Sequence, residues 1–376
     1  MKTELTLFDR TFSLFRYPVR NNETLQAWDA GDEYLISHVE EMALGEPKNI
    51  LILNDSFGAL SCWFSTEHNV TVLSDSHIAH QAIKHNLAHN HCRSVTLVDS
   101  LHSLPKNIDL VLMQIPRNNR FLTWQLSQLR QVLAPNVAVI AVNKAKEIHS
   151  STLKLFEKYL GETKTSLAWK KHRLVFSFAN CPQPTSVEPF TTWMVDEHGI
   201  TLKNLPNVYS GESLDQGARF MLDHLPTREQ YVKAIDLGCG NGVLSVKLAQ
   251  QNPQLQITCV DESFMAVASA KQNLLDNVGS ERDLRFVDNN CLDGFTAGEY
   301  DLVVCNPPFH QQQAVTDHIA WQMFCDAKHV LQTGGQLLVI GNRHLGYDVK
   351  LKRLFGKSNV SLVASNKKFV ILQATR

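Results

Sequence analysis

The sequence predicts an α/β protein made of two tandem domains with mostly parallel sheets, related to each other by duplication. Two observations support this fold class. Short apolar runs alternate with helix-like runs along the chain. Several blocks of the first half also recur, in the same order, in the second half. A chain of 376 residues, 44% of them hydrophobic, has room for two domains.

The internal repeat is faint but ordered. Residues 49–61 resemble residues 234–245, residues 72–76 resemble 259–263, residues 109–116 resemble 301–308, and Val132-Leu133 resembles Val330-Leu331. The separation between matched blocks grows in one direction along the chain, as loop insertions would make it. The alternative is two unrelated α/β domains that share only strand–helix alternation, because short apolar runs match by chance.

The second copy alternates strands and helices throughout. We expect strands at residues 233–237, 256–260, 284–288, 301–305, 336–341 and 368–373. Helices are expected between them at residues 243–251, 263–273, 316–330 and 350–355. This order is typical of a doubly wound, Rossmann-like sheet, in which ligands bind beyond the carboxyl ends of the strands. The polar motifs of this copy all fall at such ends.

A glycine-rich turn follows the first of these strands, in the run Asp236-Leu237-Gly238-Cys239-Gly240-Asn241-Gly242. Glycine lets the backbone approach a ligand closely, but the spacing differs from the G-x-G-x-x-G of dinucleotide sites. An acidic residue at the start would repel a pyrophosphate and attract an ammonium group. The turn therefore predicts a cradle for the amino-acid part of S-adenosylmethionine, formed by Asp236, Gly238, Cys239, Gly240, Asn241 and Gly242. A plain tight turn is the alternative.

Acidic and amide side chains end the next two strands. Asp261 is placed to accept hydrogen bonds from both ribose hydroxyls, and Glu262 is the neighbouring candidate. Asp288 and Asn289 are candidates for contact with the adenine, although such residues are also common in ordinary loop turns.

Asn306-Pro307-Pro308-Phe309 follows a further apolar strand. In methyl transfer to an exocyclic amine, the lone pair is delocalised into the base ring, so the amine is a poor nucleophile. The side-chain oxygen of Asn306 and the carbonyl of Pro307 can accept hydrogen bonds from both N–H groups and orient the amine. Phe309 offers a stacking face worth about 1–3 kcal/mol. These four residues are the predicted catalytic motif, and Asn306 also borders the cofactor; a Pro-Pro turn is the alternative.

The first copy lacks these ligand residues. It has Asn54, Ser56 and only Gly58 where the second copy has three glycines, and Gln114-Ile115-Pro116-Arg117 replaces the catalytic motif. We therefore expect residues 1–180 to form a non-catalytic domain, which would help to hold the substrate if that substrate is RNA. Residues 181–190, which contain three prolines, are expected to be an extended linker. Residues 191–376 are expected to form the catalytic domain.

The two motifs of the second copy resemble those of class I methyltransferases that modify amino groups of nucleic-acid bases. A duplicated chain with a degenerate first half is similar to the guanine-N2 methyltransferases of ribosomal RNA. This resemblance extends over nearly the whole chain, at residues 25–30, 53–60, 215–220, 306–312 and 341–345. It implies S-adenosylmethionine as donor, a guanine of naked large-subunit (23S) RNA as acceptor, and a segment at residues 209–220 that covers the cofactor. The small-subunit branch of this family is the near alternative.

Composition limits the partners and the cellular setting. The net charge of −1 means that affinity for RNA must come from local basic clusters, such as Lys144 with Lys146, residues 170–173, or Lys350 with Lys352. No apolar run approaches the roughly 18 residues that span a bilayer. Eight scattered cysteines and the absence of a signal-peptide pattern indicate a cytoplasmic protein, which we expect to be a monomer.

Two further features favour structural interpretations. Cys305 lies inside the predicted strand and is expected to pack as a small hydrophobic residue. His85 and His89 are four residues apart, but the run has no carboxylate framework, so we expect a solvated helix and no metal.

Other functions remain open from the residues alone. An adenine-N6 methyltransferase of DNA or RNA would use the same Asn-Pro-Pro-Phe chemistry on a different amine. A protein-glutamine methyltransferase uses a similar motif, but would not need a second α/β domain. A ribosome-assembly factor without enzyme activity would tolerate loss of Asn306.

Overall fold

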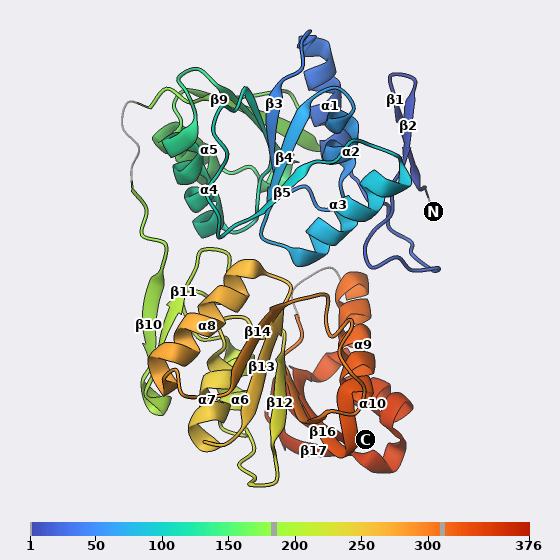
Figure 1. The fold of residues 1–376 in the computed structure, drawn as a ribbon, viewed down its shortest axis with the longest axis vertical. Helices are drawn as coiled ribbons and strands as arrows, with labels where there is room; N and C mark the ends of the chain where they lie inside the picture. Colours follow the sequence, from blue (N-terminus) through green and yellow to red (C-terminus); the bar gives the residue numbers. More distant parts are fainter. Residues whose placement is uncertain (1, 182–185, 309–312) are drawn as a thin grey trace. The chain divides into compact units, whose positions relative to one another are not determined.

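The computed structural model describes residues 2–181, 186–308 and 313–376 (Figure 1). The chain divides into two compact units, Met1–Pro189 and Phe190–Arg376. The expected linker at residues 181–190 lies partly outside the described residues. Within the described parts of the chain, no helix combines the length and apolar character that crossing a membrane requires.

The second unit contains a seven-stranded sheet whose strands lie in the order β14-β13-β12-β15-β16-β18-β17. All neighbouring strands are parallel except β18, which runs antiparallel to both β16 and β17. A separate hairpin of β10 and β11 precedes this sheet. The strands are β10 Thr191–Val195, β11 Ile200–Asn204, β12 Lys233–Leu237, β13 Gln256–Asp261, β14 Leu284–Asp288, β15 Tyr300–Cys305, β16 Leu331–Asn342, β17 Val360–Ser365 and β18 Phe369–Thr375.

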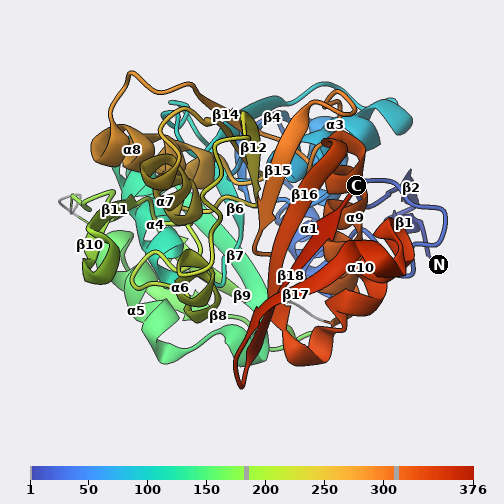
Figure 2. The same cartoon turned by 90° about the horizontal axis from the view of Figure 1, so that it is seen from below.

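Helices cover both faces of this sheet (Figures 1 and 2). One core packs α6, α7 and α8 against one face, and the other packs α9 and α10 against the opposite face. Successive side chains of a strand alternate between faces. Leu302 and Val304 therefore join the first core, while Val303 and Cys305 join the second. The helices are α6 Gln216–Leu222, α7 Val243–Gln251, α8 Phe264–Val278, α9 Gln313–Val330 and α10 Tyr347–Phe355.

The first unit repeats this plan. Its sheet has the order β5-β4-β3-β6-β7-β9-β8, and a hairpin of β1 and β2 again precedes it. Its strands are β1 Glu4–Leu7, β2 Arg10–Ser13, β3 Asn49–Leu53, β4 Asn69–Ser74, β5 Thr96–Asp99, β6 Leu110–Gln114, β7 Ala138–Lys144, β8 Thr163–Thr165 and β9 His172–Phe178. Its helices are α1 Ala30–Met42, α2 Ala59–Ser65, α3 His77–His89, α4 Asn119–Val132 and α5 Ser150–Tyr159.

The two sheets therefore confirm the predicted fold class, two Rossmann-like α/β domains with mostly parallel strands. The sheet registers also match residue by residue. Leu53 pairs with Leu73 and Met113 in the first unit. Leu237 pairs with Val260 and Cys305 in the second. Gln114 thus occupies the position of Asn306, and Asn54 that of Gly238.

The sequence analysis missed two elements of the second copy and misplaced the end of one helix. The strand β17 and the hairpin β10–β11 were not predicted. The helix expected to end at Asn273 continues to Val278, because Asn273 is a fully buried residue inside α8 rather than its C-terminus. Six of the nine strands of this unit, and the helix α7, do lie where the apolar pattern places them.

Candidate active site

The candidate site residues lie at the carboxyl ends of neighbouring parallel strands. Asp236 is in β12, Asp261 ends β13, and Asn306 directly follows β15. These strands are adjacent in the sheet, with β12 paired to both β13 and β15. The sheet therefore brings together three residues that are up to 70 positions apart in the chain. This edge is where ligands bind in open parallel sheets.

The glycine turn has a left-handed backbone at all three glycines, with φ of 74° at Gly238, 53° at Gly240 and 78° at Gly242. A Cβ atom on Gly242 would lie 2.9 Å from the backbone of Ala270, so this glycine is required for α7 to approach α8. A Cβ atom on Gly240 would meet nothing within 4 Å. Gly240 therefore borders open space, as a backbone that contacts a ligand does.

Asp236 is buried, with 1% of its surface exposed. Its Oδ2 accepts a hydrogen bond from Ser245 Oγ at 2.6 Å, while Oδ1 is buried and has no hydrogen-bond partner among the described residues. Burial raises the pKa of this carboxyl group to about 7, and the nearby Asp261 adds to the rise, whereas Ser245 opposes it. A cationic group that pairs with Oδ1 would stabilise the ionised form.

Asp261 fixes the glycine turn as well as bordering it. Its Oδ2 accepts a hydrogen bond from the Gly240 backbone N–H at 2.9 Å, and its Oδ1 accepts one from Ser263 N–H at 3.0 Å. Asn289 N–H donates to the Asp261 carbonyl at 3.0 Å, and Asn289 Nδ2 donates to the Asp293 carbonyl at 2.8 Å. The structure thus places Asn289 beside Asp261.

Four other predicted cofactor residues lie in the same region. Asn241 Nδ2 donates to Asn204 Oδ1 at 2.9 Å, which ties the glycine turn to the end of the hairpin. Glu262 directly follows β13 and Asp288 ends β14, and both are half-buried. Cys239 is buried in the second unit's core, and its contact with Cys259, together with burial, raises the pKa of its thiol. Its side chain therefore packs, and only its backbone is available to a ligand.

Asn306 is held from one side. Its Nδ2 donates to Asp215 Oδ2 at 3.3 Å, while its Oδ1 is buried and accepts no hydrogen bond from any described residue. Pro307 is buried and Pro308 half-buried. Phe309, the fourth predicted residue of the motif, lies outside the described residues. An oriented amide with an unused oxygen is suited to accept a hydrogen bond from a substrate N–H group.

Cys305 is fully buried in β15, with its Sγ 4.0 Å from Met323 Sδ. Burial raises the pKa of its thiol, which keeps the sulfur protonated and unreactive. The expected packing role is therefore confirmed for this residue. The rings of His85 and His89, both in α3, lie edge-on to Phe15, with centroid distances of 6.0 and 4.9 Å. Among the described residues, no three histidine, cysteine or carboxylate side chains gather as a metal site.

Two residues of the site were not among the predicted ones. Asp215 precedes α6, and its carboxylate also accepts hydrogen bonds from Ala218 N–H at 2.9 Å and the Tyr209 hydroxyl at 3.3 Å. Asn342 ends β16, and its Oδ1 is buried without a partner in the described part of the chain. Both residues lie in sequence stretches that carry the family resemblance, at residues 215–220 and 341–345. That resemblance is the feature of the sequence that could have identified them as site residues.

Asn306 and Asn342 belong to the same face of the sheet. Val304 pairs with Leu338, and both Val304 and Ile340 lie in the core that packs against α6, α7 and α8. Alternate residues share a face, so Asn306 and Asn342 continue these two rows. Lys368, which neighbours the Asn342 partner Phe369, donates to Gln216 Oε1 at 2.9 Å. The N-terminus of α6 thus lies close to both amides.

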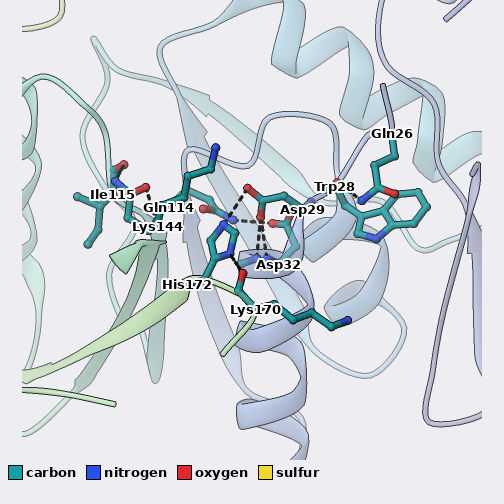
Figure 3. Close-up of polar contacts among 11 residues, drawn as sticks. Gln26, Trp28, Asp29, Asp32, Gln114, Ile115, Lys144, Lys170 and His172 are labelled. Atoms are coloured by element: carbon teal, nitrogen blue, oxygen red, sulfur yellow. Dashed lines mark hydrogen bonds and ion pairs between the residues drawn. The ribbon is translucent and has the colours of Figure 1, made fainter. Parts of the chain in front are cut away.

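In the first unit, polar side chains at the equivalent positions bond to one another (Figure 3). Gln114 Nε2 donates to Asp32 Oδ1 at 2.6 Å. Asn54, with a φ of 66° at the position of Gly238, exchanges two hydrogen bonds with Gln125 at 2.8 and 2.9 Å. The Asp55 carboxylate accepts from the backbone of Gly58 and from Ser61. The turn of the first unit is thus held by hydrogen bonds of its own side chains.

Two known families match this chain, one within each unit. The RLMG N-terminal domain family matches residues 2–181, and the methyltransferase small domain family matches residues 199–373. Ribosomal RNA large subunit methyltransferase G of Vibrio campbellii is 67% identical over 376 residues, which cover 100% of this chain and 98% of that protein. The Vibrio cholerae protein of the same name is 64% identical, with 100% of both chains covered.

A solved structure with a similar fold matches the whole chain. The T. thermophilus 16S rRNA N2 methyltransferase RsmC, determined in complex with AdoMet and guanosine, has a TM-score of 0.77 and 19% identity. The match covers 100% of this chain and 97% of that one. At this identity the likeness establishes the tandem fold alone.

Proposed function

Because the chain belongs to the ribosomal RNA large subunit methyltransferase G family, we propose that it methylates the N2 amine of one guanine in large-subunit (23S) ribosomal RNA. S-adenosylmethionine is the methyl donor. The observation that carries this proposal is the pair of buried amide oxygens, Asn306 Oδ1 and Asn342 Oδ1, which lack hydrogen-bond donors among the described residues. A guanine edge supplies such donors.

The residues at the strand ends fit this cofactor. Asp236 Oδ1 is a buried acceptor that an ammonium group would satisfy, and the Gly240 backbone borders open space. We assign the amino-acid part to Asp236 and the turn of Gly238, Cys239, Gly240, Asn241 and Gly242. The ribose is assigned to Asp261 and Glu262, and the adenine to Asp288 and Asn289. When bound, the cofactor supplies an electrophilic methyl group on a sulfonium.

The catalytic motif acts by orienting the acceptor amine. Asn306 Oδ1 accepts a hydrogen bond from one N2–H, and the carbonyl of Pro307 accepts from the other. These bonds draw electron density toward the nitrogen and direct its lone pair at the methyl group. Phe309 is assigned the stacking face for the base. No metal takes part in this assignment, and no strong general base is needed.

Asn342 distinguishes guanine from adenine in this proposal. The Watson–Crick edge of guanine carries N–H groups at N1 and N2, whereas N1 of adenine is an acceptor. The Asn342 oxygen can therefore accept a hydrogen bond from N1–H of guanine. With adenine, this oxygen would face the N1 acceptor, and no hydrogen bond would form. This argument places the adenine-N6 alternative second. The small-subunit RNA alternative shares the same base chemistry and is separated only by the choice of RNA.

The first unit holds the RNA in this proposal, with residues 1–180 as the RNA-holding domain and 191–376 as the catalytic domain. Its candidate phosphate contact is Lys171, which is exposed. Lys146 and Lys170 are also exposed, but they pair with Glu147 and Glu33 at 3.8 and 2.8 Å. Lys350 and Lys352 of the second unit likewise pair with Asp317 and Asp348 at 2.7 and 3.1 Å. The target guanine must be unpaired or flipped out of its helix, which favours naked RNA.

The eight free cysteines suit a reducing compartment, so we place the enzyme in the cytoplasm. We propose that it acts as a monomer.

The proposed function is tested by methyl transfer from labelled S-adenosylmethionine to deproteinised large-subunit RNA, small-subunit RNA and DNA, followed by nucleoside mass spectrometry. N2-methylguanosine from large-subunit RNA supports the proposal. N6-methyladenosine, or N2-methylguanosine from small-subunit RNA alone, would replace it with one of the alternatives. Cofactor binding without transfer to any nucleic acid would favour a protein substrate or an assembly role.

A further inference from the structure

We propose that Asp215 is a positioning residue for methyl transfer: its carboxylate fixes the Asn306 amide so that Oδ1 faces the acceptor amine. This inference rests on the proposed function of Asn306. It adds a residue that lies 91 positions earlier in the chain and outside both sequence motifs.

The carboxylate of Asp215 is itself fixed by its neighbours. Asp215 is the N-cap residue of α6, and its Oδ2 accepts from Ala218 N–H at 2.9 Å. Its Oδ1 accepts from the Tyr209 hydroxyl at 3.3 Å. Both oxygens are thus held in place before the Asn306 contact is counted. A carboxylate restrained in this way provides a fixed reference for the amide that it binds.

The chemistry of the pair determines which way the amide points. An ionised carboxylate accepts hydrogen bonds and cannot donate one, so the amide must present its NH₂ group to Asp215. The Asn306 oxygen is then forced to the other side, where it is buried without a partner among the described residues. A reversed amide would face oxygen with oxygen at Asp215 and would present N–H groups to the substrate N–H groups. Asp215 therefore excludes the unproductive orientation.

The first unit contains a similar pair, and it defines the rival explanation. Gln114 Nε2 donates to Asp32 Oδ1 at 2.6 Å, and Asp32 belongs to the capping box at the start of α1 (Figure 3). A carboxylate–amide bond at this place can therefore simply fasten a helix to a strand end. The experiment must separate fastening from orientation.

The Asp215→Asn variant makes this separation. Asparagine caps helices about as well as aspartate, so α6 should keep its N-terminus, but its amide can donate as well as accept and no longer dictates the orientation of Asn306. We expect kcat to fall at least 10-fold, KM for S-adenosylmethionine to change less than about 2-fold, and the thermal midpoint to move by no more than about 3 °C. The matched control is Asp32→Asn in the first unit, which should leave kcat unchanged.

A second variant tests orientation by exchange of partners. In Asp215→Asn/Asn306→Asp the carboxylate moves to position 306, where either oxygen can accept from the substrate whichever way the group turns. This double variant should recover at least 3-fold in kcat over Asp215→Asn. Asn306→Asp alone should be worse than the double variant, because it places two carboxylates face to face. Wild-type kcat in Asp215→Asn would overturn the proposal, as would a loss of activity matched by a lower thermal midpoint.

A readout without turnover keeps this inference distinct from the proposed function. In protein labelled with ¹⁵N-asparagine, Asn306→Ala identifies the side-chain NH₂ signals of Asn306. Those signals should shift strongly in Asp215→Asn and remain in place in Asp32→Asn. Unshifted signals would contradict the positioning role even if wild-type enzyme makes N2-methylguanosine. If the signals shift but wild-type enzyme makes no N2-methylguanosine, the coupling between Asp215 and Asn306 stands. The guanine-N2 function would then be wrong, and so would the claim that Asn306 Oδ1 faces a guanine amine.

Discussion

Asn86 in the first unit and Asn273 in the second make the same three hydrogen bonds. Asn86 Oδ1 accepts from Phe15 N–H, and its Nδ2 donates to the carbonyls of Phe15 and Phe57, at 3.0, 2.8 and 2.7 Å. Asn273 makes the corresponding bonds to Lys203 and Asn241, at 2.7, 3.0 and 2.9 Å. Each asparagine thus joins its helix to the second hairpin strand or the residues just after it, and to the turn before the preceding helix. This shared network supports duplication more strongly than the faint sequence repeat.

Replacement of Asn273 by alanine should destabilise the second unit and weaken cofactor binding. Asn273 is fully buried, and its loss leaves a backbone N–H and two carbonyls without their partner. We expect a loss of about 2–4 kcal/mol in the free energy of unfolding. Asn86→Ala is the matched control: it should cost a similar amount and leave cofactor affinity unchanged. Denaturant unfolding and calorimetry of cofactor binding measure the two effects. Equal cofactor affinity in both variants would contradict the role of the Asn241 carbonyl contact.

Asp236 should make both stability and cofactor binding depend on pH. Burial raises its pKa to about 7 in the folded protein, above the usual 3.8 of an aspartate side chain. The folded protein favours the protonated carboxyl group. The stability that Asp236 contributes is therefore fully present below pH 4 and is lost as pH rises through about 7. Wild-type protein should therefore lose roughly 2–4 kcal/mol of stability, relative to Asp236→Asn, between pH 4 and 7.

Binding of the cofactor should favour the ionised form of Asp236, because the ammonium group of the cofactor pairs with the ionised carboxylate. We expect proton release on binding near pH 7 in wild-type protein, and none from this group in Asp236→Asn. Calorimetry in buffers of different ionisation enthalpy detects the released proton. Proton uptake on binding, or the same release in both proteins, would show that Asp236 does not meet the ammonium group.

Asn342 should control the choice of base at the target position. The base 2,6-diaminopurine carries the same N2 amine as guanine, but its N1 has no proton to donate to Asn342 Oδ1. Once the target is mapped, an RNA fragment carrying this base there should be methylated at least about 10-fold more slowly than the guanine fragment. Asn342→Ala should narrow that ratio, and Asn342→Asp, which keeps an acceptor, should preserve it. An unchanged ratio in Asn342→Ala would remove this residue from base recognition.

The apolar pattern predicted the central strands well and the edges poorly. Strands β12 and β14 have the predicted bounds, because short apolar runs between turn residues mark buried parallel strands clearly. Strand β17 was missed because most of Val360–Ser365 is exposed at the sheet edge and carries no apolar periodicity. The hairpin β10–β11 has only five residues in each strand and follows a proline-rich segment, which hid it.

The sequence motifs identified site residues that are close together in the sequence. They did not identify residues that only the fold brings to the site. Asn306 and the glycine turn were recognised because strand ends carry them. Asp215 was not recognised as part of the site, because nothing local links a helix N-cap to a strand end 91 residues away. Asn342 was quoted only within a family stretch. Its role follows from sheet register and from its unpaired oxygen, neither of which a sequence shows.

The central claim is that the second unit performs the chemistry and the first does not, and the matched pair Asn306→Ala and Gln114→Ala tests it most directly. The measurement is the single-turnover yield of N2-methylguanosine in deproteinised large-subunit RNA, per mole of folded protein. We predict that Asn306→Ala loses at least 100-fold in rate while remaining folded, and that Gln114→Ala keeps the wild-type rate even where it lowers stability. Wild-type turnover by Asn306→Ala, or equal losses in the two variants, would contradict the account.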